Sequence, residues 1–151
     1  MNRLDDRAVS PVAGYVLTLG ITAILIGGLF VAAGTFVTEH KESTAESELQ
    51  VIGQQVSADI AAADRLTRTG GTSEVRVGRT LPDRVLGSQF SLSVRHDDGG
   101  PTEPYLLLEA TDLDVQVTVG LTSKTHVSEA TVGSGKVVVE FDNGDLVIKN
   151  A

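Results

Sequence analysis

The stretch DDRAVSPVAGYVLTLGITAILIGGLFVAAGTFVTEHKE, Asp5 to Glu42, decides the fold of this chain. Charged residues crowd both of its ends, but no Asp, Glu, Lys or Arg occurs between Arg7 and Glu39. As a helix this uncharged run would extend about 45 Å, whereas the hydrocarbon core of a bilayer is about 30 Å thick. The run also exceeds the apolar region of a secretory leader, which has about 7–15 residues. We therefore expect a membrane-spanning helix that stays on the mature protein.

The basic residues on the two sides of the run predict its orientation. Arg3 and Arg7 lie just before it, whereas Lys41 is the only Lys or Arg in the first turns after it. Lys and Arg near a membrane span favour the cytoplasmic side. The amino terminus is therefore expected in the cytoplasm, and everything after Thr38 outside.

Small residues recur on one side of the expected helix. Glycines are repeated every seven residues at positions 20, 27 and 34, which places them on nearly one stripe. Small side chains let helix backbones approach closely within a membrane. The alternative is that glycine is simply common in membrane helices. The residues that we expect at helix–helix contacts are Gly20, Ala23, Gly27, Gly28, Ala32 and Gly34.

The first turns of the run carry a start signal for a helix. Pro11 is tolerated in a first helical turn, and Ser10 before it is a preferred cap. We therefore expect the helix to begin near Ser10–Pro11, after a short polar segment, Met1–Ala8.

The segment DRAVSPVAGYVLTLGITAILIGGL, Asp6 to Leu29, resembles the amino terminus of archaeal type IV pilin and pilin-like proteins, especially those of halophilic archaea. In that family a charged leader, a prepilin-type (class III) signal peptide, ends in a basic and a small residue. The resemblance therefore implies cleavage by a membrane peptidase after Arg7 and Ala8, so that Val9 becomes the first residue. It also implies that the apolar helix is retained and packs into a filament. Bacterial pilins usually carry a glutamate at the position of Ala13, so their charge-pairing step has no counterpart here.

The helical pattern continues beyond the apolar run. In residues 38–71 one narrow apolar stripe recurs at helical spacing. A sheet of the same chain or a neighbouring helix could cover this stripe, and we favour the chain's own sheet. Asp64 and Arg68 are spaced to form an ion pair, Gly53 permits a local bend, and Gly70–Gly71 is a stop signal. The stripe consists of Ala45, Leu49, Ile52, Val56, Ile60, Ala63 and Leu66.

After Gly71 the apolar period changes to the alternation of strands. The clearest unit is a hairpin over residues 136–150, in which Asn143–Gly144 is a strong turn signal. We expect an α+β fold, in which a long, partly transmembrane amino-terminal helix precedes a small antiparallel sheet of about five or six strands, as in pilins. The expected segments are a leader (1–8), a transmembrane and assembly helix (9–38), an extracytoplasmic amphipathic helix (39–69) and a β head domain (72–151). The expected strands lie within residues 73–79, 89–97, 104–110, 112–121, 126–132 and 136–150.

The composition argues against several classes of function. The net charge is −8, which disfavours nucleic acid as a partner, and either a solvated acidic surface or adaptation to high salt would produce it. The chain has no cysteine, and its three histidines, His40, His96 and His126, lack the spacing of a metal motif. The acidic pairs Asp97–Asp98 and Asp112/Asp114 lack the surroundings of a calcium loop. We therefore expect no enzymatic activity, no catalytic residues, no metal and no cofactor.

Two functions agree with this layout. The first is a structural pilin-like subunit that is inserted as a single-pass membrane precursor, cleaved by a prepilin peptidase and assembled with other pilin subunits into a cell-surface filament. The second is a permanently anchored extracytoplasmic β domain that binds a ligand or partner. Only three of the Phe and Tyr residues lie beyond the apolar run, which is few for a specific binding surface.

Overall fold

A computed structural model describes residues 6–70, 74–96 and 103–151, and of residues 6–11 it describes the backbone alone. The described residues form one helix, α1 (Asp6–Gly70), and seven strands. The chain divides into two compact units, Met1–His40 and Lys41–Ala151. The strands are β1 (Arg76–Leu81), β2 (Phe90–Arg95), β3 (Tyr105–Ala110), β4 (Gln116–Gly120), β5 (Thr131–Gly133), β6 (Gly135–Asp142) and β7 (Asp145–Asn150).

The helix ends where the sequence predicts but begins earlier. Its last residue is Gly70, so the predicted stop is confirmed. The predicted start near Ser10–Pro11 is wrong, because α1 already begins at Asp6. An acidic residue is favoured in a first helical turn, where it faces the positive end of the helix dipole. Pro11 consequently lies in the second turn, a position where proline removes one helical hydrogen bond.

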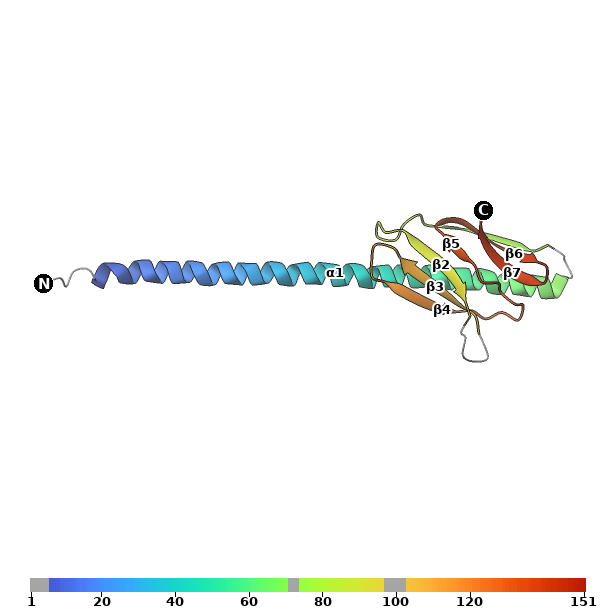
Figure 1. The fold of residues 1–151 in the computed structure, drawn as a ribbon, viewed down its shortest axis with the longest axis horizontal. Coiled ribbons are helices and arrows are strands. Elements are labelled where there is room, and N and C mark those ends of the chain that lie inside the picture. Colours follow the sequence, from blue (N-terminus) through green and yellow to red (C-terminus); the bar gives the residue numbers. More distant parts are fainter. Residues whose placement is uncertain (1–5, 71–73, 97–102) are drawn as a thin grey trace. The chain divides into compact units, whose positions relative to one another are not determined.

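The strands form two antiparallel sheets rather than the single sheet expected. Their orders are β1-β6-β7 and β4-β3-β2-β5, and every neighbouring pair is antiparallel (Figure 1). The chain passes from β5 to β6, and so from one sheet to the other, through Ser134 and Gly135. Gly135 has a φ of 94°, which a residue with a side chain rarely adopts. A glycine at this corner therefore allows the two sheets to enclose a common core.

The predicted hairpin at the end of the chain is confirmed. β6 and β7 pair from Val137↔Asn150 to Asp142↔Asp145. Asn143 and Gly144 between them have φ values of 51° and 102°. These positive angles fit the tight turn whose twist matches that of the flanking strands.

The strands of the second unit lie along the carboxyl-terminal part of α1 (Figure 1). The apolar stripe of the helix joins residues of both sheets in one hydrophobic core, which we call the head core. The prediction that the chain's own strands cover the stripe is therefore confirmed for all of its members except one. Leu66 remains exposed, with 53% of its surface accessible. The buried members are Ala45, Leu49, Ile52, Val56, Ile60 and Ala63.

At Gly53, α1 lies close against the four-stranded sheet. A Cβ atom at this position would lie 2.7 Å from Cγ2 of Val119 and 2.9 Å from Cδ1 of Leu108. Both distances are shorter than ordinary van der Waals contact. The sequence permits a bend at Gly53, but α1 continues through it. The glycine is therefore explained by packing against β3 and β4.

A paired ionic contact joins β1 to the same helix. Arg79 donates two hydrogen bonds to the carboxylate of Asp59, and the one from Nη2 to Oδ1 measures 2.9 Å. This hydrogen bonding raises the pKa of Arg79, so its guanidinium keeps its charge. Two parallel bonds fix the orientation of both groups and so hold β1 along α1.

Candidate functional site

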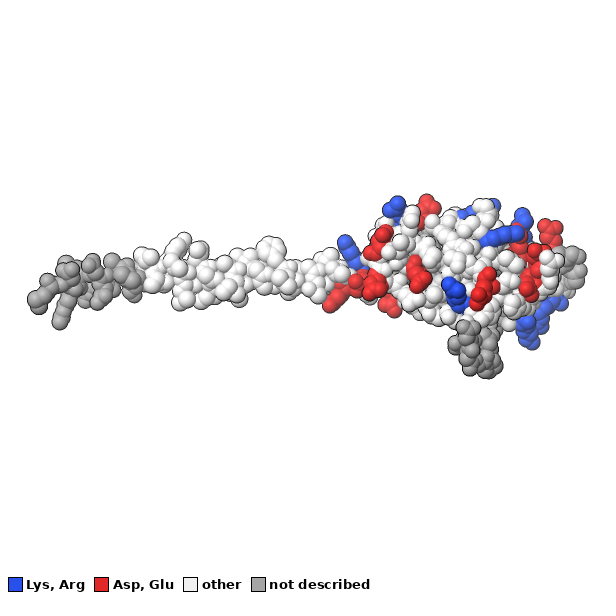
Figure 2. Space-filling model, viewed as in Figure 1, with Lys and Arg blue, Asp and Glu red and all other residues white. Residues whose placement is uncertain are grey.

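The apolar segment, residues 12–38 of α1, is exposed along its whole length. Every one of its side chains is exposed, and none of them is charged, so that it forms the white stretch in Figure 2. α1 is long and apolar enough, by length and composition, to cross a membrane. An exposed apolar surface of this extent is typical of a site that contacts lipid or other proteins. Its large side chains include Tyr15, Leu17, Ile24, Leu25, Leu29, Phe30 and Phe36.

The hydroxyl groups of the threonines in the apolar segment are hydrogen-bonded within the helix. Each hydroxyl donates to the backbone carbonyl four residues earlier, at 2.8 Å for Thr22 to Thr18 and 2.9 Å for Thr18 to Gly14. Thr35 and Thr38 do the same, at 3.2 Å. A polar group in an apolar environment costs free energy unless it is hydrogen-bonded. The segment can therefore enter lipid or a protein core without an unpaired hydroxyl from these four residues.

The glycines of the apolar segment have no role in packing within the chain. A Cβ atom added at Gly20, Gly27, Gly28 or Gly34 would meet nothing within 4 Å. Gly53, by contrast, has no room for a Cβ atom. The predicted packing positions, which also include Ala23 and Ala32, all lie on exposed faces of α1. They leave the backbone of this segment open to the approach of another helix.

The predicted cleavage site lies at the beginning of α1. Arg7, Ala8 and Val9 have a helical backbone, and their side chains lie outside the described part of the chain. Residues 1–5 of the predicted leader lie outside the described residues altogether. The first turn of a helix has N–H groups without helical partners and opens readily.

Asp64 is a buried acidic side chain in the head core, with 5% of its surface exposed. Its Oδ1 accepts hydrogen bonds from the backbone N–H of Thr125 at 2.9 Å and from its hydroxyl at 2.7 Å. Oδ2 lies 3.6 Å from Nη1 of Arg68, so the predicted ion pair is confirmed. Burial raises the pKa of Asp64, but the bonds from Thr125 and the charge of Arg68 outweigh it, so that the pKa is lowered. Asp64 thus holds the loop after β4 against the end of α1.

Replacing Asp64 by asparagine is expected to destabilise the head by about 1–3 kcal/mol, because a charged acceptor of two hydrogen bonds is lost. The folded pKa lies below the unfolded value of 3.8, so the carboxylate stabilises the fold above that value. The stabilisation is lost as the pH falls through the folded pKa. Urea unfolding of both proteins from pH 7 to pH 2 should show their difference in stability shrinking only at the acid end. A difference that stayed constant down to pH 2 would contradict this assignment.

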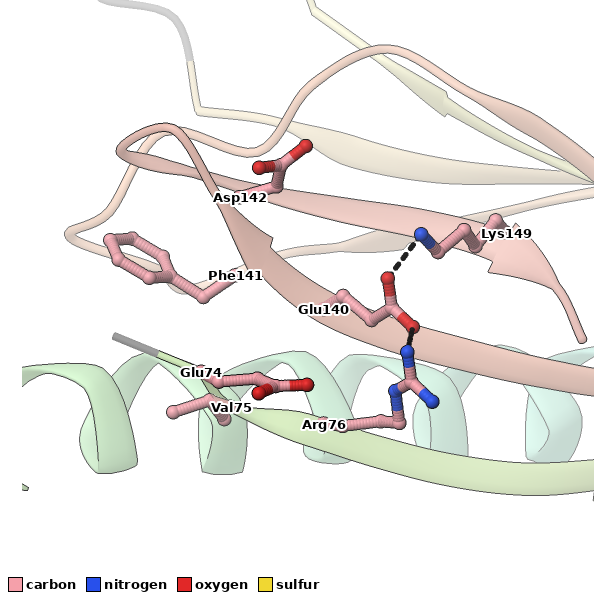
Figure 3. A pocket seen from close by; sticks show the side chains of 7 residues that line it. All are labelled: Glu74, Val75, Arg76, Glu140, Phe141, Asp142 and Lys149. Carbon is pink, nitrogen blue, oxygen red and sulfur yellow. Dashed lines mark ion pairs between the residues drawn. The ribbon is translucent and has the colours of Figure 1, made fainter. Parts of the chain in front are cut away.

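A second ionic centre lies on the outer face of the three-stranded sheet (Figure 3). Glu140 on β6 lies between Arg76 on β1 and Lys149 on β7 and forms an ion pair with each. The hydrogen bond from Lys149, together with the charge of Arg76, lowers the pKa of Glu140 despite its partial burial. These three groups line a hollow of about 420 Å³ together with Phe141 and other residues. Because Glu140 already pairs with both cations, the centre ties three strands together.

The histidines of the head form a stacked pair. The rings of His96 and His126 are nearly parallel, with centroids 5.3 Å apart. Each Nδ1 lies near a carboxylate, 3.5 Å from Glu129 for His96 and 3.3 Å from Asp145 for His126. Within the described ranges, no group of three or more His, Asp and Glu side chains could hold a metal ion. Asp97 and Asp98 lie outside the described residues, and Asp112 and Asp114 lie in the turn between β3 and β4.

Three features of the site were not predicted from the sequence: the threonine hydrogen bonds, the bonds from Thr125 to Asp64, and the centre at Glu140. The four threonines of the uncharged run are visible in the sequence, which is a usable signal. Glu140 follows the apolar run Val137–Val139. Its partner Lys149 lies on the next strand of the same hairpin, whereas Arg76 comes from a strand distant in sequence. The pairing of Asp64 with Thr125 and of Glu140 with Arg76 depends on tertiary contacts.

Comparison with known proteins gives one match. Neither the curated proteins nor the solved structures contain a match to this chain. A family model described as "Family of unknown function (DUF7266)" matches residues 4–150, which covers the apolar segment, the rest of α1 and all seven strands of the described residues. The chain therefore belongs to the DUF7266 family.

Proposed function

We propose that this protein is a structural pilin-like subunit, inserted in the membrane as a precursor. A prepilin peptidase cuts it between Ala8 and Val9. The retained helix, Val9–Thr38, then leaves the membrane and packs with the helices of other subunits in a type IV pilus-like surface filament. In the precursor the amino terminus is cytoplasmic, in accord with Arg3 and Arg7 before the segment.

The observation that carries this proposal is the contrast between the two parts of α1. Residues 45–63 bury their apolar stripe in the head core, whereas residues 12–38 bury nothing within the chain. The apolar side chains of this segment are exposed, its threonine hydroxyls donate to backbone carbonyls, and its glycines have no packing role within the chain. These properties suit a segment that resides first in lipid and then among helices. A segment of this kind fits an assembly element, and the head provides the surface of the filament.

Mass spectrometry of the protein isolated from its own cells tests the cleavage. We expect a mature chain that begins at Val9. Replacing Arg7 by glutamine or Ala8 by leucine should block processing and leave the precursor in the membrane. The matched control is Arg3→Gln, which removes a basic residue of the leader away from the junction and should be processed normally.

An intact leader on the mature protein would contradict the proposal and favour a permanently anchored head. Normal processing of both the Arg7 and the Ala8 variants would place the cut elsewhere. Electron microscopy of surface filaments, with and without the gene, then tests whether the processed chain is part of a filament.

A further inference from the structure

A cavity of about 240 Å³ in the head lies at the end of α1, and several of the side chains that line it are cationic. Arg65 and Arg68 line it from the helix, and Lys124 lines it from the loop after β4. Thr122 and Ser123 of the same loop add hydroxyl groups to its wall. Guanidinium, ammonium and hydroxyl donors that meet in one hollow suit a carboxylate.

The charges in this cavity are not balanced. Asp64 is its one carboxylate and pairs with Arg68. Neither Arg65 nor Lys124 has a carboxylate within 4.0 Å in the described part of the chain. Both side chains are exposed. In a protein whose net charge is −8, these cations give the cavity a local excess of positive charge.

The opposite charge is found near the start of the same part of α1. Glu42 and Glu46 are four residues apart, so they share one helix face and repel each other. Glu46 is exposed, Glu42 is half-buried, and neither has an ion pair among the described residues. Figure 2 shows acidic side chains gathered on this part of the head. A cation from outside the chain would relieve this repulsion.

One chain cannot bring these two charge groups together. Glu46 and Arg65 lie on one helix, about 30 Å apart along its axis. A second copy shifted along α1 could place its Glu42 and Glu46 at the cavity of the first. Copies that insert in a membrane by the same helix are parallel, so this contact joins unlike surfaces and can repeat from copy to copy.

We propose that the cavity formed by Arg65, Arg68 and Lys124 receives the Glu42–Glu46 face of a neighbouring copy of this chain. The contact supplies the missing carboxylates to the cavity and sets the axial shift between subunits. It rests on the proposed function, because it assumes parallel copies that assemble. The apolar segment provides adhesion between helices, and the charged contact selects their register.

Charge reversal in the full-length protein tests this contact. The double variants Arg65→Glu/Lys124→Glu and Glu42→Lys/Glu46→Lys should each reduce the yield of sheared filaments roughly tenfold or more, because like charges then meet in the contact. The variant with all four changes should recover a large part of the wild-type yield, since the pairs are re-formed in reverse. The matched control Arg95→Glu/Lys136→Glu changes the charge of two exposed cations elsewhere in the head and should assemble normally.

Cross-linking provides a second readout that does not depend on filament yield. The natural chain has no cysteine, so Glu46→Cys/Lys124→Cys introduces one pair only. Under mild oxidation of filaments, this variant should form a ladder of covalent oligomers, whereas the two single variants should not.

The outcomes separate the two proposals. Wild-type filaments together with undiminished yields of both double variants, or no ladder, would overturn the charged contact and leave the pilin-like function standing. Absence of filaments from wild-type cells would overturn the function and this contact with it. Efficient dimers from either single cysteine variant would show that like surfaces meet, which also overturns the contact.

Discussion

Replacing Gly53 by leucine is expected to destabilise the head strongly. Even the first side-chain carbon would lie 2.7 Å from Val119 and 2.9 Å from Leu108, and a leucine adds three further carbons beyond it. Overpacking a core costs about 1–3 kcal/mol or more, and leucine here separates α1 from β3 and β4. A small domain is stable by only about 5–15 kcal/mol, so this loss is a large part of the total.

The measurement is urea unfolding of the full chain in detergent, followed by hydrogen exchange of the β2 and β3 amides. The control is Ala58→Leu, which adds a side chain of the same size on the exposed side of the same helical segment. Its unfolding should stay within about 0.5 kcal/mol of wild type. Equal stability of the Gly53 variant and the Ala58 variant would contradict the close packing of α1 on the sheet.

Replacing Gly27 by leucine is expected to leave the stability of the head unchanged and to impair assembly. No atom of the chain lies within 4 Å of a Cβ at this position, so the unfolding of the head should not change. Close approach of neighbouring helices, however, needs small residues at the contact. We therefore expect the filament yield to fall by roughly tenfold or more. A tenfold fall corresponds to the loss of about 1.4 kcal/mol of association free energy per contact.

Ala33→Leu is the matched control, because it enlarges an exposed small residue on another side of the helix from Gly20, Gly27 and Gly34. Normal membrane insertion of all variants, measured by cell fractionation, shows that hydrophobicity is not the cause. Filaments of the Gly27 variant at wild-type yield would remove the small-residue stripe from the proposed assembly surface.

The sequence predicts the helical part of the fold well, because its signals are local. A run without charge and a stripe at helical spacing depend only on the order of residues, and both are found in α1. The prediction that the strands cover Leu66 is wrong for a geometric reason. Leu66 follows Ile60 and Ala63 by two successive steps of three residues, and each such step rotates the side chain by about 60° in the same direction. Leu66 has therefore turned away from the core, and Thr67 lies closer to that face.

The sheets are predicted less well, because pairing joins residues that are distant in sequence. Alternation indicates the strands, but it does not show that β2 lies between β3 and β5 or that β6 lies between β1 and β7. The predicted strand over 126–132 is mostly irregular, and only Thr131–Gly133 forms β5. Val127 instead makes an isolated bridge to Leu146. A second tight turn at Leu86–Gly87 was missed, because leucine is rare at its positive φ of 48°.

The features of the candidate site likewise divide into those with local sequence signals and those that depend on long-range contacts. The apolar segment and its glycines can be read from the sequence, since they need no partner within the chain. The cavity around Arg65 cannot be read from the sequence. Lys124 is brought to this cavity only by the fold of the strands that separate it from Arg65 in the chain. Cleavage after Ala8 remains a prediction from the resemblance of the first residues to pilin leaders.

The order of the elements along the chain determines when the head can form during synthesis. The stripe on α1 is made first, yet Leu146 and Ile148 of β7, at the opposite end of the sequence, belong to the core that covers it. The core therefore cannot close until almost the whole chain has left the ribosome, and until then the stripe has no strands to cover it. Because α1 is synthesised before all of these strands, its apolar segment can enter the membrane while the head is still unfolded. In the proposed topology, with the head outside the membrane, export can therefore precede folding, and no folded domain has to be moved across the bilayer.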